Sequence, residues 1–146
     1  REDGPCFWEP VATSRYFEET IPEPPLFGRT ALEQALVDQW IRRVEFAVMM
    51  PVRNFWRHAH PRTAALLNQF KDFGESYKET YQGAQKYLDR ELADRQFLVG
   101  DAYWMADICL LSTVDFAEWI GLPVEPEFEN LVAWRERAKA RPSAKA

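Results

Sequence analysis

The sequence predicts an all-helical domain preceded by a short strand and helix. Three observations carry this prediction. Apolar residues recur every three or four positions over most of the chain beyond residue 30, which is the period of an amphipathic helix. Three prolines between Pro22 and Pro25 separate a short front segment from that helical part. The 146 residues are 47% hydrophobic and 14% aromatic, which is enough to fill one core.

The front segment comprises residues 1–21 and is too short to bury a core alone. Its residues 6–8, Cys-Phe-Trp, predict a short strand. Pro10 then suits the first position of a helix over Val11 to Glu19, because that position needs no amide donor. We therefore expect residues 1–21 to be the end of another domain, residues 22–30 to be a linker, and residues 31–146 to be a helical domain.

The first long helix is predicted by a four-residue repeat of apolar side chains with charged residues between them. The repeat runs through Leu32, Leu36, Trp40, Val44 and Val48. The next proline, at position 51, lacks the amide donor of an interior helical residue. We expect it to kink the helix or to end it.

A second repeat predicts a helix of up to about thirty residues before the Gly100-Asp101 break, since apolar side chains again recur at helical spacing. Its expected inner face carries Phe73, Tyr77, Tyr81, Ala84, Leu88 and Leu92.

The next predicted helix, Met105 to Ile120, is apolar on nearly all sides, which places it at the centre of the core. Gly121 and Pro123 are expected to stop it. A last helix, over about residues 127–140, should turn Phe128, Leu131 and Trp134 inward.

Composition excludes several classes of protein. The net charge of −5 argues against a sequence-independent nucleic-acid binder, which needs an excess of cations. No apolar run reaches the about 20 residues of a membrane span. The two cysteines, Cys6 and Cys109, form no CxxC pair, which fits a reducing compartment better than a disulfide scaffold.

Four segments, in the right order, resemble the cytosolic glutathione transferases. Phe97 to Ile108 resembles the motif of their C-terminal domain. This motif is an apolar pair, Gly-Asp, two free positions, then Ser or Thr, any residue and Ala-Asp. Leu131 to Ser143 resembles their final helix, and Trp8 to Phe17 resembles the last strand and helix of their first domain. Met50 to Pro61 resembles the corresponding segment of bacterial members of the family.

This resemblance implies a thioredoxin-like domain that binds glutathione and an all-helical domain that lines the pocket for an electrophile. The chain would hold the end of the first and all of the second. The family's thiol-activating residue and its glutathione-gripping cis-proline would lie upstream of Arg1, so we expect the chain alone to be inactive. The resemblance further implies a cytoplasmic homodimer that uses glutathione and a small hydrophobic electrophile, with no metal, nucleic acid or membrane partner.

Two positions depart from the family pattern. The family has an acidic residue and then Ser or Thr where this chain has Glu9-Pro10. Glu9 can still bind the amino group of glutathione, but Pro10 offers neither a hydroxyl nor an amide N–H to the γ-glutamyl carboxylate of glutathione. Alternatively, Glu9-Pro10 only starts a helix. The second departure is Trp104, which replaces a capping Ser or Thr, so the capping box with Asp107 loses one of two bonds. We expect Asp107 to be structural.

Position in the family implies an electrophile pocket lined by Met49, Met50, Arg53 and Phe116. Methionine suits an irregular apolar pocket because it is flexible and polarizable. A Met or Phe at helical spacing is more often plain core, and we favour the pocket for Met50 and the core for Phe116.

Cations gather after Pro51, at Arg53, Arg57, His58, His60 and Arg62. They could attract an anionic substrate, but cations also favour a solvated helix end, and we prefer the latter. Histidines two residues apart diverge on a helix, so we expect no metal site there.

Two functions remain open. The first is conjugation of glutathione to an electrophile. The second, favoured by Pro10, is a noncatalytic binding or scaffold role on the same fold.

Overall fold

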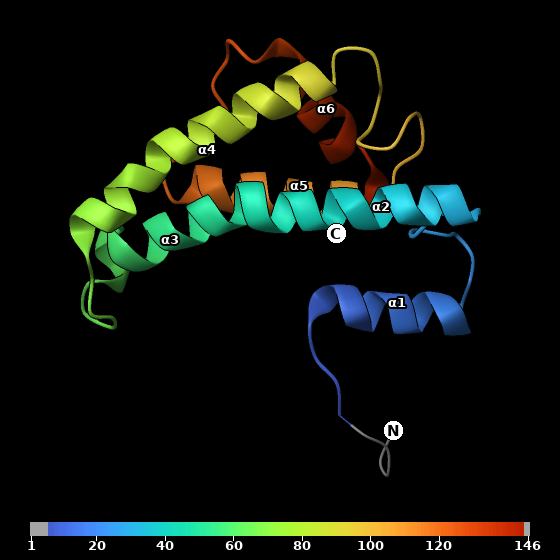
Figure 1. The fold of residues 1–146 in the computed structure, drawn as a ribbon, viewed down its shortest axis with the longest axis horizontal. Helices are drawn as coiled ribbons and strands as arrows, with labels where there is room; N and C mark the ends of the chain where they lie inside the picture. Colours follow the sequence, from blue (N-terminus) through green and yellow to red (C-terminus); the bar gives the residue numbers. More distant parts are fainter. Residues whose placement is uncertain (1–5, 145–146) are drawn as a thin grey trace.

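The computed structural model describes residues 6–144, and nearly all of their regular structure is helical. The α-helices are α1 (Pro10–Thr20), α2 (Ala31–Arg43), α3 (Met50–His58), α4 (Lys71–Glu91), α5 (Met105–Trp119) and α6 (Glu129–Lys139). A π-helical segment, η1 (Val44–Met49), joins α2 to α3. Figure 1 shows α5 alongside the rod formed by α2, η1 and α3, with α4 crossing above it and α1 set apart beneath it. The all-helical fold class is confirmed.

The rod does not end at Pro51, because helical structure continues through this residue to His58; of the two expected outcomes, termination is therefore ruled out. The π-helical segment precedes the proline, and within it the Met50 N–H bonds to the Glu45 carbonyl, five residues back. The wider turn accommodates a residue that cannot donate to the ladder. The rod therefore runs without a break from Ala31 to His58.

Helix α5 is the centre of the core, as predicted. Nine of its fifteen residues are buried. Gly121, at φ 87°, ends the helix as expected, because its backbone takes the left-handed conformation that glycine adopts without strain. The predicted inner face of α6 is also confirmed, since Phe128, Leu131 and Trp134 are buried.

The ends of two predicted apolar faces are wrong. Leu32, in the first turn of α2, is 69% exposed, and Phe73, in the first turn of α4, is 48% exposed. Leu32 lies before the buried stripe of α2, whereas Phe73 packs on the ring of His58 at the surface and not on the core. Helix α4 also stops after 21 residues, well before Gly100, and residues 92–104 form an irregular hook.

The hook is fastened to α5 by Asp107. This carboxylate is fully buried and accepts hydrogen bonds from the N–H groups of Leu98 (3.0 Å) and Trp104 (3.1 Å) and from the indole N–H of Trp134 (2.9 Å). The Trp104 indole donates to the Val99 carbonyl instead of capping α5. Asp107 thereby joins the hook, the start of α5 and helix α6.

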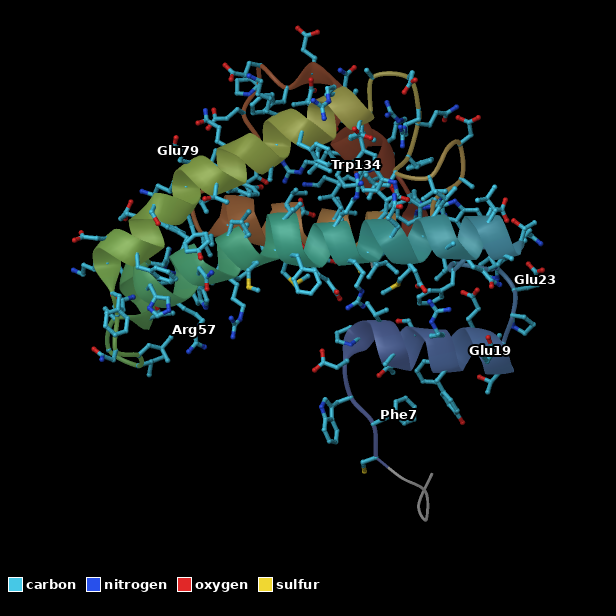
Figure 2. All side chains as sticks on the ribbon, in the orientation of Figure 1. Phe7, Glu19, Glu23, Arg57, Glu79 and Trp134 are labelled. Atoms are coloured by element: carbon cyan, nitrogen blue, oxygen red, sulfur yellow. The ribbon has the colours of Figure 1, made fainter. Side chains whose placement is uncertain are left out.

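The front segment differs in part from its prediction. Helix α1 forms, but residues 6–8 are not in a strand, because the described chain offers them no neighbouring strand with which to pair. No residue of α1 is buried. The large apolar side chains that residues 6–21 leave exposed are Phe7, Trp8, Tyr16, Phe17 and Ile21. Figure 2 shows Phe7 on the side of α1 away from the rod.

Polar contacts hold α1 beneath the rod. The Glu18 carboxylate accepts the backbone N–H groups of Leu26 (2.6 Å) and Phe27 (3.1 Å) in the linker, residues 22–30. Arg15 forms an ion pair with Asp38 of α2 and lies over the Phe27 ring. Among residues 6–144, no helix combines the length and apolar character that a membrane span requires.

Candidate functional site

A cavity of about 900 Å³ lies between the N-terminus of α1 and the rod, and we call it the main cavity. Figure 2 shows the side chains that project into this space from both helices. Glu9, Pro10 and Arg15 line it from the α1 side, Arg42, Phe46, Met49, Met50 and Arg53 from the rod, and Cys109 from α5. Three of the four residues predicted for the electrophile pocket therefore lie on this cavity.

Glu9 has a strained backbone at the mouth of the main cavity. Its φ of 78° and ψ of 120° are unfavourable for a residue with a side chain. Such strain persists only when the surrounding structure imposes it, and it concentrates at functional sites. The side chain is exposed, so the carboxylate is free to meet a ligand.

The start of α1 offers backbone donors beside that carboxylate. The first helical hydrogen bond runs from the Thr13 N–H to the Glu9 carbonyl (2.9 Å). The amides of Val11 and Ala12 precede this bond, and both residues line the main cavity. Free amides at a helix N-terminus suit an anion. The site thus places an acceptor, Glu9, next to donors, although Pro10 contributes no N–H.

Two of the three cations on the main cavity are neutralised. Arg15 pairs with Asp38, and Arg42 pairs with Glu45 at 2.9 Å. Among the described residues, Arg53 has no acidic group within ion-pair distance, and its side chain is exposed. Arg53 is therefore the cation of this cavity that remains available to an anionic ligand.

The sulfur-bearing side chains make part of the wall apolar. Met49 and Met50 are 38% and 39% exposed, so they form surface rather than core. Cys109 is buried, and burial raises the pKa of its thiol to about 11. At neutral pH it is a neutral thiol and a poor nucleophile.

Phe116 lies on a second cavity of about 230 Å³ between α3 and α5, which we call the aromatic cavity. Met49 and Arg53 line both cavities, whereas Met50 lines only the main one. Phe116 is 37% exposed, so the expectation that it is plain core is wrong. Trp56 also lines this cavity, although the sequence had not indicated it as a site residue. It lies seven residues after Met49, so the two share one helical face, and this spacing could have identified it.

The predicted cationic cluster does not form one site. His58 packs against the rings of Phe70 and Phe73, whereas His60 stacks on Trp56 with 4.7 Å between ring centroids. Burial, with a smaller effect of the nearby Arg62 charge, lowers the pKa of His60. Among residues 6–144, no three His, Cys, Asp or Glu side chains come together as metal ligands do.

Comparison with known proteins points to one family. Residues 74–142 match the family described as glutathione S-transferase, C-terminal domain. Glutathione S-transferase 2 of Saccharomyces cerevisiae is 32% identical over 146 residues, which cover 99% of this chain and 63% of that protein. The chain thus spans about three fifths of the length of this relative and of two similar probable glutathione S-transferases of Nicotiana tabacum.

Two solved structures extend the match to three dimensions. The crystal structure of Gtt2 from Saccharomyces cerevisiae has a TM-score of 0.92 at 31% identity, over 99% of this chain and 71% of that one. A glutathione S-transferase domain-containing protein from Marinobacter aquaeolei has a TM-score of 0.88, with the same identity and coverage. Sequence and fold agree over nearly the whole chain, which therefore belongs to the glutathione S-transferase family.

Proposed function

We propose that this protein conjugates glutathione to a hydrophobic electrophile, with glutathione at the N-terminus of α1 and the electrophile against the rod. The observation that carries the proposal is the strained Glu9, held at the mouth of the main cavity with its carboxylate exposed. The start of a helix does not require a positive φ at the residue before it, whereas a ligand site can hold a residue in such a strained conformation to position its side chain.

Glutathione carries an ammonium and a carboxylate on its γ-glutamyl group, and the site offers a partner to each. We assign the ammonium to the Glu9 carboxylate and the carboxylate to the amides of Val11 and Ala12. Pro10 supplies no donor there. Each missing hydrogen bond to a charged group costs about 1.5–3 kcal/mol, so we expect glutathione to bind more weakly here than it would beside Ser or Thr.

The chemical step requires the thiolate of glutathione, because the thiol is a poor nucleophile. We propose that the group that activates the thiol lies outside these 146 residues, in the part of the relatives that the chain does not span. The residues of this chain that line the main cavity then orient the reactants, and the apolar wall of Met49, Met50 and Phe46 excludes water. We further propose a cytoplasmic homodimer that uses no metal and binds neither nucleic acid nor membrane.

The test is conjugation of glutathione to 1-chloro-2,4-dinitrobenzene by the protein expressed from its complete coding sequence. We expect turnover, and we expect Glu9→Gln to raise the KM for glutathione by about tenfold or more, because a charge-assisted bond to the ammonium is lost. Glu19→Gln, at the other end of α1 in Figure 2, is the matched control and should leave the KM unchanged. If the protein shows no conjugation and is also not retained on a glutathione resin, the proposal is refuted.

A noncatalytic binding role is the second candidate, and Pro10 is the observation that favours it. Pro10→Ser restores an amide and a hydroxyl at the first position of α1. If wild type does not bind glutathione and Pro10→Ser does, the proline has removed the ligand site and the noncatalytic role stands. If both bind and wild type turns over, that role is excluded.

A further inference from the structure

We propose that the electrophile of this protein is a planar aromatic compound with an anionic substituent. Its ring would occupy the aromatic cavity, and its anion would contact Arg53. This inference rests on the proposed function for its catalytic meaning, but the binding that it describes does not require glutathione.

The size of the aromatic cavity fits one or two fused rings. Its volume is about 230 Å³ and it opens to solvent, so a ring of this size would lie against its wall with one edge exposed. A longer or branched ligand would have to extend out of the cavity.

The walls of the aromatic cavity favour a flat ring. Trp56 and Phe116 meet edge to face, with ring centroids 5.5 Å apart and an interplanar angle of 74°. Trp119 packs on Trp56 at 5.6 Å and on Phe116 at 5.8 Å, which holds both rings in place. Aromatic rings gain about 0.5–1.5 kcal/mol from such offset or edge-to-face contacts beyond the burial of their area. A planar ring inserted here can extend this packing.

The hydroxyl groups on the cavity wall are already engaged. The Ser112 hydroxyl donates to the Ile108 carbonyl (2.9 Å), and the Thr113 hydroxyl donates to the Cys109 carbonyl (2.7 Å). The Arg53 guanidinium, by contrast, makes neither an ion pair nor a hydrogen bond with another described residue. The wall is thus apolar apart from one available cation.

Arg53 stands where the two cavities meet, since it lines both. A ring in the aromatic cavity would therefore have its substituent at the boundary of the main cavity, where we place glutathione. A guanidinium binds a carboxylate or sulfonate through two parallel hydrogen bonds. This geometry selects an aromatic acid over a neutral aromatic compound of the same size.

The experiment compares 2-naphthoate with the neutral 2-naphthalenemethanol by isothermal titration calorimetry, without glutathione. We expect 2-naphthoate to bind more tightly, and Arg53→Gln to weaken its binding by about three- to tenfold, as expected for a half-solvated charged contact. Binding of the alcohol should not change. Arg57→Gln is the matched control, because Arg57 lies one turn further along α3 and lines neither cavity.

A second pair of variants locates the ring. Phe116→Ala should weaken the binding of both compounds, whereas Phe70→Ala, at an exposed ring that lines neither cavity, should leave both unchanged. The proposal is overturned if Arg53→Gln affects acid and alcohol equally or neither, or if Phe116→Ala has no effect. Binding of 2-naphthoate that depends on Arg53, in a protein that does not bind glutathione, would refute the proposed function and leave the aromatic-acid site standing.

Discussion

Substitution of Asp107 by asparagine tests how the hook, α5 and α6 are held together. The two side chains have nearly the same size, so the change creates no cavity. In the native protein one carboxylate oxygen accepts from the Leu98 N–H and the Trp134 indole, and the other accepts from the Trp104 N–H. Asparagine can keep the first oxygen, but its NH₂ group replaces the second and faces the Trp104 N–H. Two donors then point at each other in a buried site.

The expected cost follows from that count. Two buried donors, the Trp104 N–H and the asparagine NH₂, then lack an acceptor; because one such donor costs about 1–3 kcal/mol, we expect Asp107→Asn to lower the free energy of unfolding by about 2 kcal/mol or more. Asp107→Ala abandons all three donors, so it should cost about 3–5 kcal/mol, the range for breaking a buried charged network.

Urea unfolding followed by circular dichroism measures these values. Ser112→Ala is the control on the same helix: Ser112 is exposed and bonds only its own helix, so the change should stay within about 0.5 kcal/mol. A cost below that value for Asp107→Asn would show that the three hydrogen bonds do not stabilise the fold, and would refute this account of the hook.

Three further predictions follow from particular contacts. Gly74→Ala should destabilise the protein by about 1–3 kcal/mol in urea unfolding, because its Cβ would lie 2.7 Å from the Ala59 nitrogen, whereas Gly83→Ala, with open space around it, should stabilise by about 0.5–1 kcal/mol. Equal effects would contradict the close helix contact. Glu18→Ala removes the acceptor of two linker amides, so we expect protease cleavage within the linker to be about tenfold faster; an unchanged rate would contradict that anchoring. Burial raises the pKa of Asp107 above its ordinary value, although hydrogen bonds oppose the shift. The contribution of Asp107 to stability is therefore fully present below its pKa in the unfolded state, and it is lost as the pH rises through its pKa in the folded state. The stability of wild type relative to Asp107→Asn should therefore fall as pH rises through that window, and a rising difference would contradict this sign.

The helices were predictable because their apolar repeats are long and regular. Trp40, Val44 and Val48 form a buried stripe on the rod, and the periodicity alone shows this. The same rule failed at Leu32 and Phe73, because periodicity describes a face of a helix but not which positions on that face a neighbouring element covers. Tertiary contacts decide that coverage.

Pro51 shows a different limit. A local rule predicts a kink or an end, but the preceding residues widen into a π-helical segment that lets the rod continue. The strand expected at residues 6–8 failed because a strand depends on a partner, which a local sequence pattern cannot supply.

The candidate site was predictable only through resemblance. Met49, Met50 and Arg53 were named by their position in the family, and the structure places them on one cavity. The strain at Glu9 has no local signal, because a glutamate before a proline ordinarily takes an extended conformation. The division into two cavities depends on where α5 packs against α3. Because the sequence does not show this contact, Trp56 was not predicted as a site residue.

A crystal structure of the complete protein with S-benzylglutathione tests the central claim most directly. We predict that the γ-glutamyl ammonium contacts the Glu9 carboxylate, that its carboxylate contacts the amides of Val11 and Ala12, and that the benzyl group lies against the rod near Met49. A γ-glutamyl group bound away from α1, or a benzyl group on the opposite face of the rod, would contradict the claim.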